Sequence, residues 1–380
     1  VPTAGTCGVM GTASTMALMT EAMGMMLPGG AAIPAFAADR LRHAEETGTR
    51  AVALAKEKVT PDQIITQAAL NNAMKTLLAI GGSTNGIVHM AAVAGRLGLN
   101  VDLDAFDTMG RDVPMLVDLK PNGSYYMEDL WKAGGLTTIL REIEDLLDLD
   151  CPTVSGKTLG ENLAAMAPGW QQDVVRPRSN PLFSKGSMAV LRGNLAPNGA
   201  VLKQSAADQG LLVHEGRAVV FENLEDLAER IDSADLDVTP DDVLVLRNIG
   251  PKGAPGMPEA GYIPIPKKLA SQGVKDMVRI SDGRMSGTAF GTIILHVSPE
   301  AADGGPLALV QTGDRIRLDT PNRSLTLLVD EAEMKSRREA WTPPPAHKGS
   351  GRGYLKLYLD TVTQAEDGAD FGFLQATGDS

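Results

Sequence analysis

The sequence predicts an α/β protein in which a helix-rich first part is followed by a β-rich, barrel-like second part. Helical spacing of apolar residues, with capping signals, extends from residue 14 to 166, and short β-type runs follow from 188 to 330. Between them, residues 170–185 contain prolines and no periodicity, which is typical of a linker. We therefore predict two domains, 1–175 and 176–380, a number that the length of 380 residues allows.

Capping residues and glycines delimit the helices of the first part. A Met-rich helix is predicted over Ser14–Leu27. Thr60 as N-cap, Pro61 at the first helical position and Gln63 completing a capping box predict the start of a longer helix. That helix should end at Gly81, because glycine readily adopts the left-handed conformation of a helix end. Further helices are predicted after Ser83, over 128–148 and over 158–166.

The second part contains many short runs rich in β-branched and apolar residues. A hairpin turn is predicted at Glu215-Gly216, and a short helix at Leu224–Ile231. Such a series of strands with few helices favours a barrel-like domain. The predicted strands are 188–193, 199–203, 211–214, 217–221, 242–247, 275–281, 291–297, 307–319 and 324–330.

Composition and charge exclude several classes of protein. No apolar run approaches the ~20 residues that a membrane span needs. The net charge of −12 argues against a nucleic-acid surface but leaves a small anionic substrate possible. Two cysteines exclude a disulfide framework and fit a reducing cytoplasm, where we expect the protein. The chain begins at Val1 with neither a signal nor a transit peptide, so we expect it to be incomplete.

Cys7 lies in a loop with glycines on both sides, immediately before a predicted helix. Amides at a helix N-terminus favour a thiolate, which can act as a nucleophile or as a metal ligand. A lone cysteine is also compatible with an inert, buried side chain, so spacing alone leaves both interpretations open. Cys151 follows a predicted helix and is expected to be inert.

Two loops of the second part could carry chemistry. The loop Gly250–Glu259 is rich in glycine and proline, and its last carboxylate could ligate Mg²⁺ or simply be solvated. Ser286 lies in a turn of small residues after a predicted strand and could present its hydroxyl to a pocket, or be a turn residue only. His89 and His296 lie in apolar stretches and are predicted to be core histidines with satisfied hydrogen bonds.

Seven motifs, taken together and in their order, resemble one family over nearly the whole chain. It is the dihydroxy-acid and sugar-acid dehydratase family, also called the IlvD/Edd family. The motifs are GTCGVMGTASTM (5–16), GGSTN (81–85), DLKPNGSYYMEDL (118–130), TVSGKTLGENL (153–163), GSMAVLRGNLAPNGAVLK (186–203), GPKGAPGMPE (250–259) and SDGRMSGTAFG (281–291).

The resemblance implies a helix-rich remainder of an α/β iron–sulfur domain, followed by a β-barrel-like swivelling domain. It implies a [2Fe–2S] cluster, or alternatively a [4Fe–4S] cluster, together with Mg²⁺. Cys7 matches the third cysteine ligand of the cluster, and Glu259 matches a carboxylate near the Mg²⁺. Ser286 matches the proposed catalytic base, which removes the C2 proton while the C3 hydroxyl leaves as water.

The sequence departs from the family pattern in one respect. The first two cluster cysteines and a carbamylated lysine of the family lie upstream of the segment that Cys7 matches, and they are absent here. One cysteine does not hold a cluster that needs several thiolates. We therefore expect that this chain alone does not bind the cluster.

The substrate that the resemblance implies is a sugar acid. The cysteine motif reads GVMGTASTM instead of the GGMYTANTM typical of the branched-chain branch, and Ile249 precedes the glycine-rich loop. We expect an aldonic acid such as arabinonate, xylonate or galactonate. The alternatives are a dihydroxy-acid dehydratase of branched-chain amino-acid synthesis, or an inactive fragment that acts as a scaffold. We expect a homo-oligomer, a dimer or a tetramer, that binds neither nucleic acid nor membrane.

Overall fold

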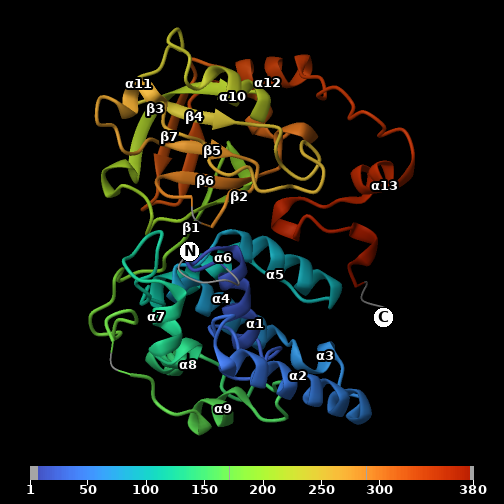
Figure 1. Cartoon of the computed structure of the whole chain (residues 1–380). Helices are drawn as coiled ribbons and strands as arrows, with labels where there is room; N and C mark the ends of the chain where they lie inside the picture. The colour runs from blue at the N-terminus through green and yellow to red at the C-terminus, as the bar shows by residue number, and fades with distance from the viewer. Residues whose placement is uncertain (1–6, 171, 288, 377–380) are drawn as a thin grey trace. The chain divides into compact units, whose positions relative to one another are not determined.

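The computed structural model describes residues 7–170, 172–287 and 289–376, and the chain divides into two compact units (Figure 1). The first unit contains residues 1–86 and 99–187, and the second contains residues 87–98 and 188–380. Each unit is built from different elements. No helix among the described residues is both long enough and apolar enough to cross a membrane.

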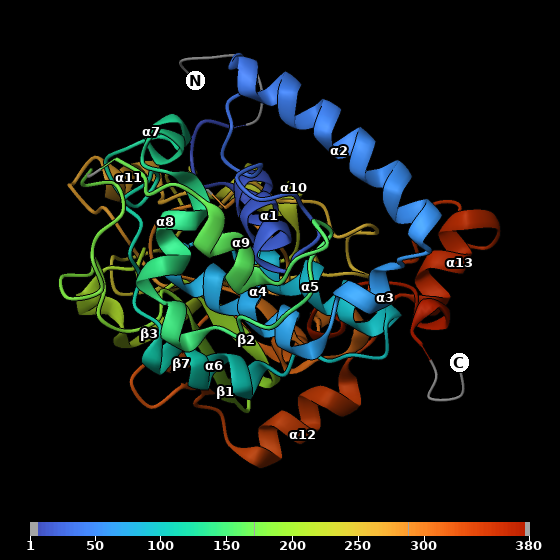
Figure 2. The ribbon, with the colours of Figure 1, turned by 90° about the horizontal axis from the view of Figure 1, so that it is seen from below.

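The first unit is helical. Its central helix α4 packs against α1, α6 and α8, whereas α2 lies at the edge and has no fully buried residue (Figure 2). Its helices are α1 (Thr12–Ala22), α2 (Ala38–Glu57), α3 (Pro61–Ile64), α4 (Gln67–Ile80), α6 (Leu103–Asp112), α7 (Met127–Lys132), α8 (Gly135–Glu142) and α9 (Leu159–Ala165). Short 3₁₀ turns, such as η1 (Glu144–Leu146), complete it.

The close approach of α1 and α4 depends on a glycine. A Cβ atom on Gly82 would lie 2.8 Å from both the Leu77 and the Thr15 side chains, which is closer than real Cβ contacts allow. Thr15 also accepts a hydrogen bond from the Ser83 amide at 2.9 Å. The GGSTN segment therefore joins the end of α4 to α1, the helix that follows Cys7.

The longer helix predicted from residue 60 is wrong at its start. Thr60 makes no capping hydrogen bond, and α3 ends after four residues at Ile64. The cap of α4 is Thr66, whose hydroxyl accepts from the Ala69 amide at 3.1 Å. The predicted end is confirmed, since Gly81 adopts a left-handed conformation with φ 59°.

Two other predicted helices have different bounds. The Met-rich helix ends at Ala22 instead of continuing to Leu27. The helix predicted over 128–148 is interrupted by Gly134 and Gly135, which both have positive φ and separate α7 from α8. The helix predicted over 158–166 is confirmed as α9, with a capping box between Thr158 and Glu161.

The second unit contains a closed barrel, which confirms the predicted barrel-like architecture. Its described strands are hydrogen-bonded in the order β1-β2-β6-β5-β4-β3-β7-β8, with parallel pairing from β3 through β4 and β5 to β6. The strands are β1 (Ala189–Gly193), β2 (Ala196–Leu202), β3 (Val213–Phe221), β4 (Val243–Leu246), β5 (Arg279–Ser281), β6 (Ile293–Ser298), β7 (Arg315–Asp319) and β8 (Ser324–Leu327).

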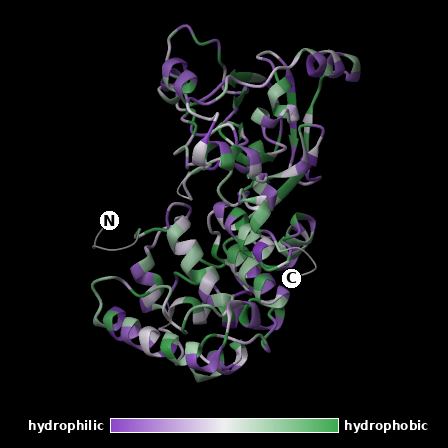
Figure 3. Ribbon diagram, turned by 90° about the vertical axis from the view of Figure 1, so that its right-hand side faces the viewer, coloured by the Kyte–Doolittle hydropathy of each residue, from purple (hydrophilic) through white to green (hydrophobic). Residues whose placement is uncertain are grey.

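The alternation of side chains along β4 explains how the barrel is filled and covered. Val243 and Val245 belong to one buried cluster, together with residues of all the other strands. Leu244 and Leu246 belong to a second cluster that includes Leu227 of helix α10 (Leu224–Arg230). Successive residues of a strand point to opposite faces, so β4 is buried on both sides. Figure 3 shows hydrophobic residues along the strands and the inner helices.

The predicted hairpin at Glu215-Gly216 is wrong. Both residues lie inside the continuous strand β3, where they pair with Arg317 and Ile316 of β7. The glycine is needed for another reason, because a Cβ atom at Gly216 would collide with the carbonyl oxygen of Asp241. The strand predicted over 307–319 is also shorter, since Pro306–Leu309 forms a 3₁₀ turn.

Helix α5 (Asn85–Arg96) lies mostly in the second unit, although its sequence lies within the first predicted domain. Arg96 forms an ion pair with Asp370 at 2.6 Å. The Ala376 amide donates to the Gly95 carbonyl at 2.9 Å. The last part of the chain, with α12 (Glu331–Ala340) and α13 (Gly353–Thr361), therefore includes a segment that packs on α5.

Candidate active site

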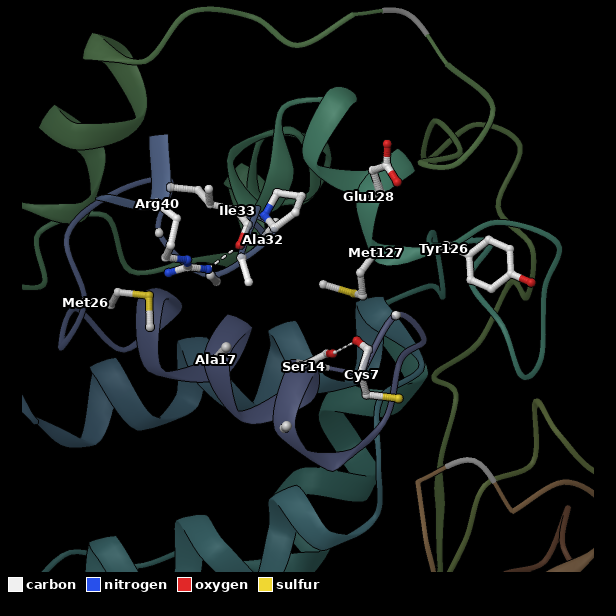
Figure 4. A pocket seen from close by; sticks show the side chains of 16 residues that line it. Cys7, Ser14, Ala17, Met26, Ala32, Ile33, Arg40, Tyr126, Met127 and Glu128 are labelled. Carbon is white, nitrogen blue, oxygen red and sulfur yellow. Dashed lines mark hydrogen bonds between the residues drawn. The ribbon is translucent and has the colours of Figure 1, made fainter. Parts of the chain in front are cut away.

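A pocket of about 250 Å³ lies beside Cys7 in the first unit (Figure 4). The Cys7 loop is fixed from two sides: the Met10 amide donates to Lys120 O and the Met127 amide donates to Gly8 O, both at 2.9 Å. The Ser14 hydroxyl in the first turn of α1 donates to the carbonyl oxygens of Cys7 and Val9, at 3.3 and 3.0 Å. Cys7 itself is exposed and lines the pocket.

The far wall of this pocket is a turn that a buried carboxylate holds in place. Glu21 accepts hydrogen bonds from the Gly29 and Ala31 amides at 2.7 and 2.8 Å. Burial raises the pKa of Glu21 to about 7. Arg40 lines the pocket away from Cys7, and its guanidinium donates to the Ile33 carbonyl (Figure 4).

The second cysteine has a different environment. Cys151 is buried, accepts a hydrogen bond from the Asn72 side chain at 3.6 Å and has a pKa raised by burial. It is not among the residues that line the Cys7 pocket. No group of three or more His, Cys, Asp or Glu side chains able to hold a metal occurs among the described residues. Cys7 thus offers one thiol, which does not by itself complete an iron–sulfur site.

In the second unit the structure brings Glu259 and Ser286 close to one another. The segment 259–261 runs parallel to 284–286: Glu259 pairs with Arg284, the Ala260 amide donates to Arg284 O at 2.9 Å, and the Ser286 amide donates to Gly261 O at 3.1 Å. We call these two segments, 259–261 and 284–286, the paired segments. They fix the backbones of the predicted Mg²⁺ ligand and of the predicted base.

Two buried carboxylates anchor the loops that carry the paired segments. Asp282 accepts from the amides of Asn248, Ile249 and Ala301 at 3.2, 3.1 and 2.9 Å. Burial raises its pKa, against the lowering effect of these amides.

Glu300 is the second anchor. It accepts from the Lys252 amide at 2.9 Å and from the Gly253 amide at 3.0 Å, and burial raises its pKa to about 7. The first part of the glycine-rich loop after β4 is therefore held at residues 248–249 and 252–253 by carboxylates that sequence reasoning did not single out.

The prediction that His296 is a satisfied core histidine is wrong. The side chain is 5 % exposed, but neither ring nitrogen has a hydrogen-bond partner among the described residues. Burial lowers its pKa to about 3, and Arg284 and His89 add to the effect. His89 on α5 is only partly buried, and its pKa is lowered by burial and by Arg284, against Glu259. Both histidines therefore lie near the paired segments.

Comparisons with known proteins match two consecutive parts of the chain. Residues 1–162 match the dihydroxy-acid/6-phosphogluconate dehydratase N-terminal domain, and residues 173–369 match the C-terminal domain of the same proteins. The chain belongs to the dihydroxy-acid/6-phosphogluconate dehydratase family.

Within this family the chain is similar to proteins with different named substrates. It is 48% identical to the L-arabinonate dehydratase of Rhizobium leguminosarum bv. trifolii, over 98% of this chain and 64% of that protein. It is 46% identical to the 6-deoxy-6-sulfo-D-gluconate dehydratase of Pseudomonas putida, over 98% and 64%. The dihydroxy-acid dehydratase of Ignicoccus hospitalis is 43% identical over 94% of this chain and 65% of its own length. The chain thus spans less than two thirds of the length of these relatives.

Of the site residues predicted from the sequence, Cys7 belongs to the first unit, and Glu259 and Ser286 belong to the second. Sequence reasoning missed Glu21, Arg40, Asp282, Arg284 and Glu300. A signal existed for Glu21, which is a lone acidic residue inside a Met-rich helix, and for Asp282 and Arg284, which lie within a recognised motif.

Proposed function

We propose that the protein is a hydro-lyase that removes water from an aldonic acid and produces a 2-keto-3-deoxy acid. The observation that carries the proposal is the pairing of segments 259–261 and 284–286, which holds a carboxylate and a hydroxyl from two family motifs together. The names of the relatives support a sugar acid, since the sugar-acid dehydratases at 46% and 48% identity exceed the dihydroxy-acid dehydratase at 43%.

In the proposed reaction Ser286 receives the C2 proton. The electron pair of the C2–H bond then forms the C2–C3 double bond and the C3–O bond breaks. The departing hydroxide takes a proton from solvent to become water, and Ser286 returns its proton to solvent. The resulting enol becomes the 2-keto acid by proton transfer to C3. A serine hydroxyl is a weak base, so it must lie in a field of positive charge that stabilises its alkoxide. Arg284, two residues away, contributes one such charge.

The proposal includes an iron–sulfur cluster and Mg²⁺, with Cys7 and Glu259 as one ligand each. When bound, these groups would supply Lewis-acid chemistry at the leaving hydroxyl and at the acidified C2 position. The described residues complete neither site, because each would receive a single ligand from them. The proposed steps therefore concern the side chains of this chain only.

The proposed substrates are arabinonate, xylonate and galactonate. A dihydroxy acid of branched-chain amino-acid synthesis is the second candidate, favoured by the relative at 43% identity. A scaffold without activity is the third. A homo-oligomeric state and a cytoplasmic location belong to the proposal on the basis of the family resemblance.

The test is a substrate screen on anaerobically purified protein, in the length in which the organism makes it. Semicarbazide detects 2-keto acids formed from each aldonate and from 2,3-dihydroxyisovalerate, and iron and sulfide are measured on the same sample. Turnover of an aldonate with bound iron supports the proposal. Turnover of 2,3-dihydroxyisovalerate alone selects the second candidate, and no turnover without bound iron selects the third.

A further inference from the structure

Arg284 has an unusual environment for an arginine of the second unit. Its Nε donates to Met257 O at 2.7 Å, which fixes the side chain. Its two terminal nitrogens have no hydrogen-bond acceptor and no carboxylate partner among the described residues. By contrast, Arg279 and Arg337 each form an ion pair, at 2.7 and 2.5 Å. Arg284 is therefore a fixed cation whose guanidinium edge is available to an anion.

A second, independent observation comes from His296. It has a φ of +56°, a conformation that is costly for a residue with a side chain, and its two buried ring nitrogens have no partner. Its amide donates to Gly283 O at 3.3 Å, beside Arg284. Buried polar groups are normally paired, so the two ring nitrogens of His296 are free to hydrogen-bond a molecule that binds beside Arg284.

Helix α5 brings a third group to the same place. Val88 packs against Met257, the residue that holds Arg284, and His89 follows Val88. Because burial and the Arg284 charge disfavour protonation of both histidines, each ring is a neutral hydrogen-bonding group. Two side chains near the Arg284 guanidinium, His89 and His296, can therefore hydrogen-bond a ligand, and neither forms an ion pair with Arg284.

Arg284 and Ser286 lie on one side of their segment. Both are partly exposed, whereas Met285 between them is fully buried. Side chains two residues apart in an extended segment share a face, about 7 Å apart. The carboxylate carbon of an aldonate is bonded directly to C2, so an anchor at Arg284 would bring the C2–H bond toward Ser286.

We propose that Arg284 binds the carboxylate of the substrate, with His296 and His89 lining that subsite as hydrogen-bonding groups. This inference rests on the proposed function, since Ser286 acts on the carbon next to the bound carboxylate. A guanidinium binds a carboxylate through two parallel hydrogen bonds, which fixes orientation as well as position.

The test compares a charged ligand with its neutral analogue. In the protein as the organism makes it, calorimetry gives the affinity of an aldonate and of the corresponding aldonamide for the wild type and for Arg284→Gln. We expect the aldonate to lose about 30-fold or more in affinity and the aldonamide to change less than threefold. Arg284→Lys should recover part of the loss, because it keeps the charge but not the paired hydrogen bonds.

Arg315→Gln serves as the matched control, because Arg315 is an exposed arginine paired with Glu215 on the barrel surface. It should change neither affinity. Equal losses for aldonate and aldonamide in Arg284→Gln would mean that Arg284 is structural, and an unchanged aldonate affinity would also overturn the proposal.

Failure of the wild type to bind an aldonate would count against the proposed substrate and would not by itself test the role of Arg284. If the wild type neither binds nor dehydrates an aldonate, the same comparison with 2,3-dihydroxyisovalerate and its amide tests the anchor. A charge-dependent loss with that pair keeps Arg284 as the carboxylate anchor and rejects the sugar acid, and no charge-dependent loss with either pair rejects the anchor.

His296→Asn tests the lining of the subsite, because asparagine tolerates a positive φ and keeps a polar side chain. We expect a higher KM with kcat changed less than threefold, and an unchanged KM would remove His296 from the subsite.

Discussion

The two regions that carry candidate residues are built in different ways. Around Cys7, backbone hydrogen bonds fix a loop, and the side chain itself is exposed beside a largely apolar pocket. Around Ser286, buried carboxylates hold the backbone, and charged side chains gather on a pair of short segments. The difference indicates that Cys7 can be replaced without loss of stability, whereas the second region depends for its stability on the buried carboxylates Asp282 and Glu300.

The largest effect is expected at Ser286. Ser286→Ala should lower kcat by at least about 100-fold, since a positioned base contributes about 10²–10⁴ to rate. The melting temperature should stay within 1–2 °C of wild type, roughly what a neutral surface change gives. Turnover near the wild-type rate would remove Ser286 as the base.

Cys7→Ser tests whether the Cys7 thiol binds iron without contributing to stability. It should leave the melting temperature unchanged and lower the iron and sulfide content of the purified protein, because an exposed thiol contributes binding and not packing. Unaltered iron content would mean that Cys7 is not a ligand.

A loss of stability is expected at Asp282. Asp282→Asn removes one oxygen of a carboxylate that accepts from amides of two separate segments, 248–249 and 301, and should cost about 2–4 kcal/mol of unfolding free energy, measured in urea. Asp235→Asn is the control, because Asp235 is exposed on the surface of the same unit, and it should stay within about 0.5 kcal/mol. An equal, small effect of both variants would contradict the anchoring role.

Stability should also depend on pH through Glu21 and Glu300, one in each unit. Each has a pKa raised from 4.5 to about 7 in the folded protein, so the folded state binds more protons than the unfolded state between these values. Their contribution is therefore fully present below pH 4.5 and falls as pH rises through 7, by at most about 3 kcal/mol each. Glu21→Gln and Glu300→Gln should each flatten the pH dependence of unfolding, and an unchanged slope would contradict the assigned burial.

The smallest effect concerns two threonines of the first unit. Thr66→Ala should cost about 1 kcal/mol, because it removes the cap of α4, whereas Thr60→Ala should cost close to nothing. The reverse order in thermal melts would mean that the residue before Pro61 is the effective cap.

The architecture could be predicted from the sequence because strands and helix ends have local causes. The barrel follows from short β-type runs, and the end of α4 follows from Gly81. Errors arose where a residue serves a distant contact. A turn was predicted at Gly216 because glycine is common in turns. In the structure the glycine is needed because the carbonyl oxygen of Asp241 approaches it too closely for a residue with a Cβ atom.

The candidate site was only partly predictable. Cys7, Glu259 and Ser286 were proposed from motifs, and their roles stay predictions. Asp282 lies within a recognised motif, but neither its burial nor that of Glu300 could be predicted, because a carboxylate becomes buried only where distant amides converge on it. The environment of His296 could not be predicted for the same reason. The apolar residues around it in the sequence predict that it is buried, but they do not predict whether its ring nitrogens have hydrogen-bond partners.

Residues 87–98 belong to the second unit although they lie within the first part of the sequence. The chain passes from one unit to the other three times, after residues 86, 98 and 187. A barrel transplanted between relatives as residues 188–380 would leave behind the helix on which its own last segment packs. The second structural unit is therefore discontinuous in the sequence, and a chimera that exchanges the barrel should carry residues 87–98 with it.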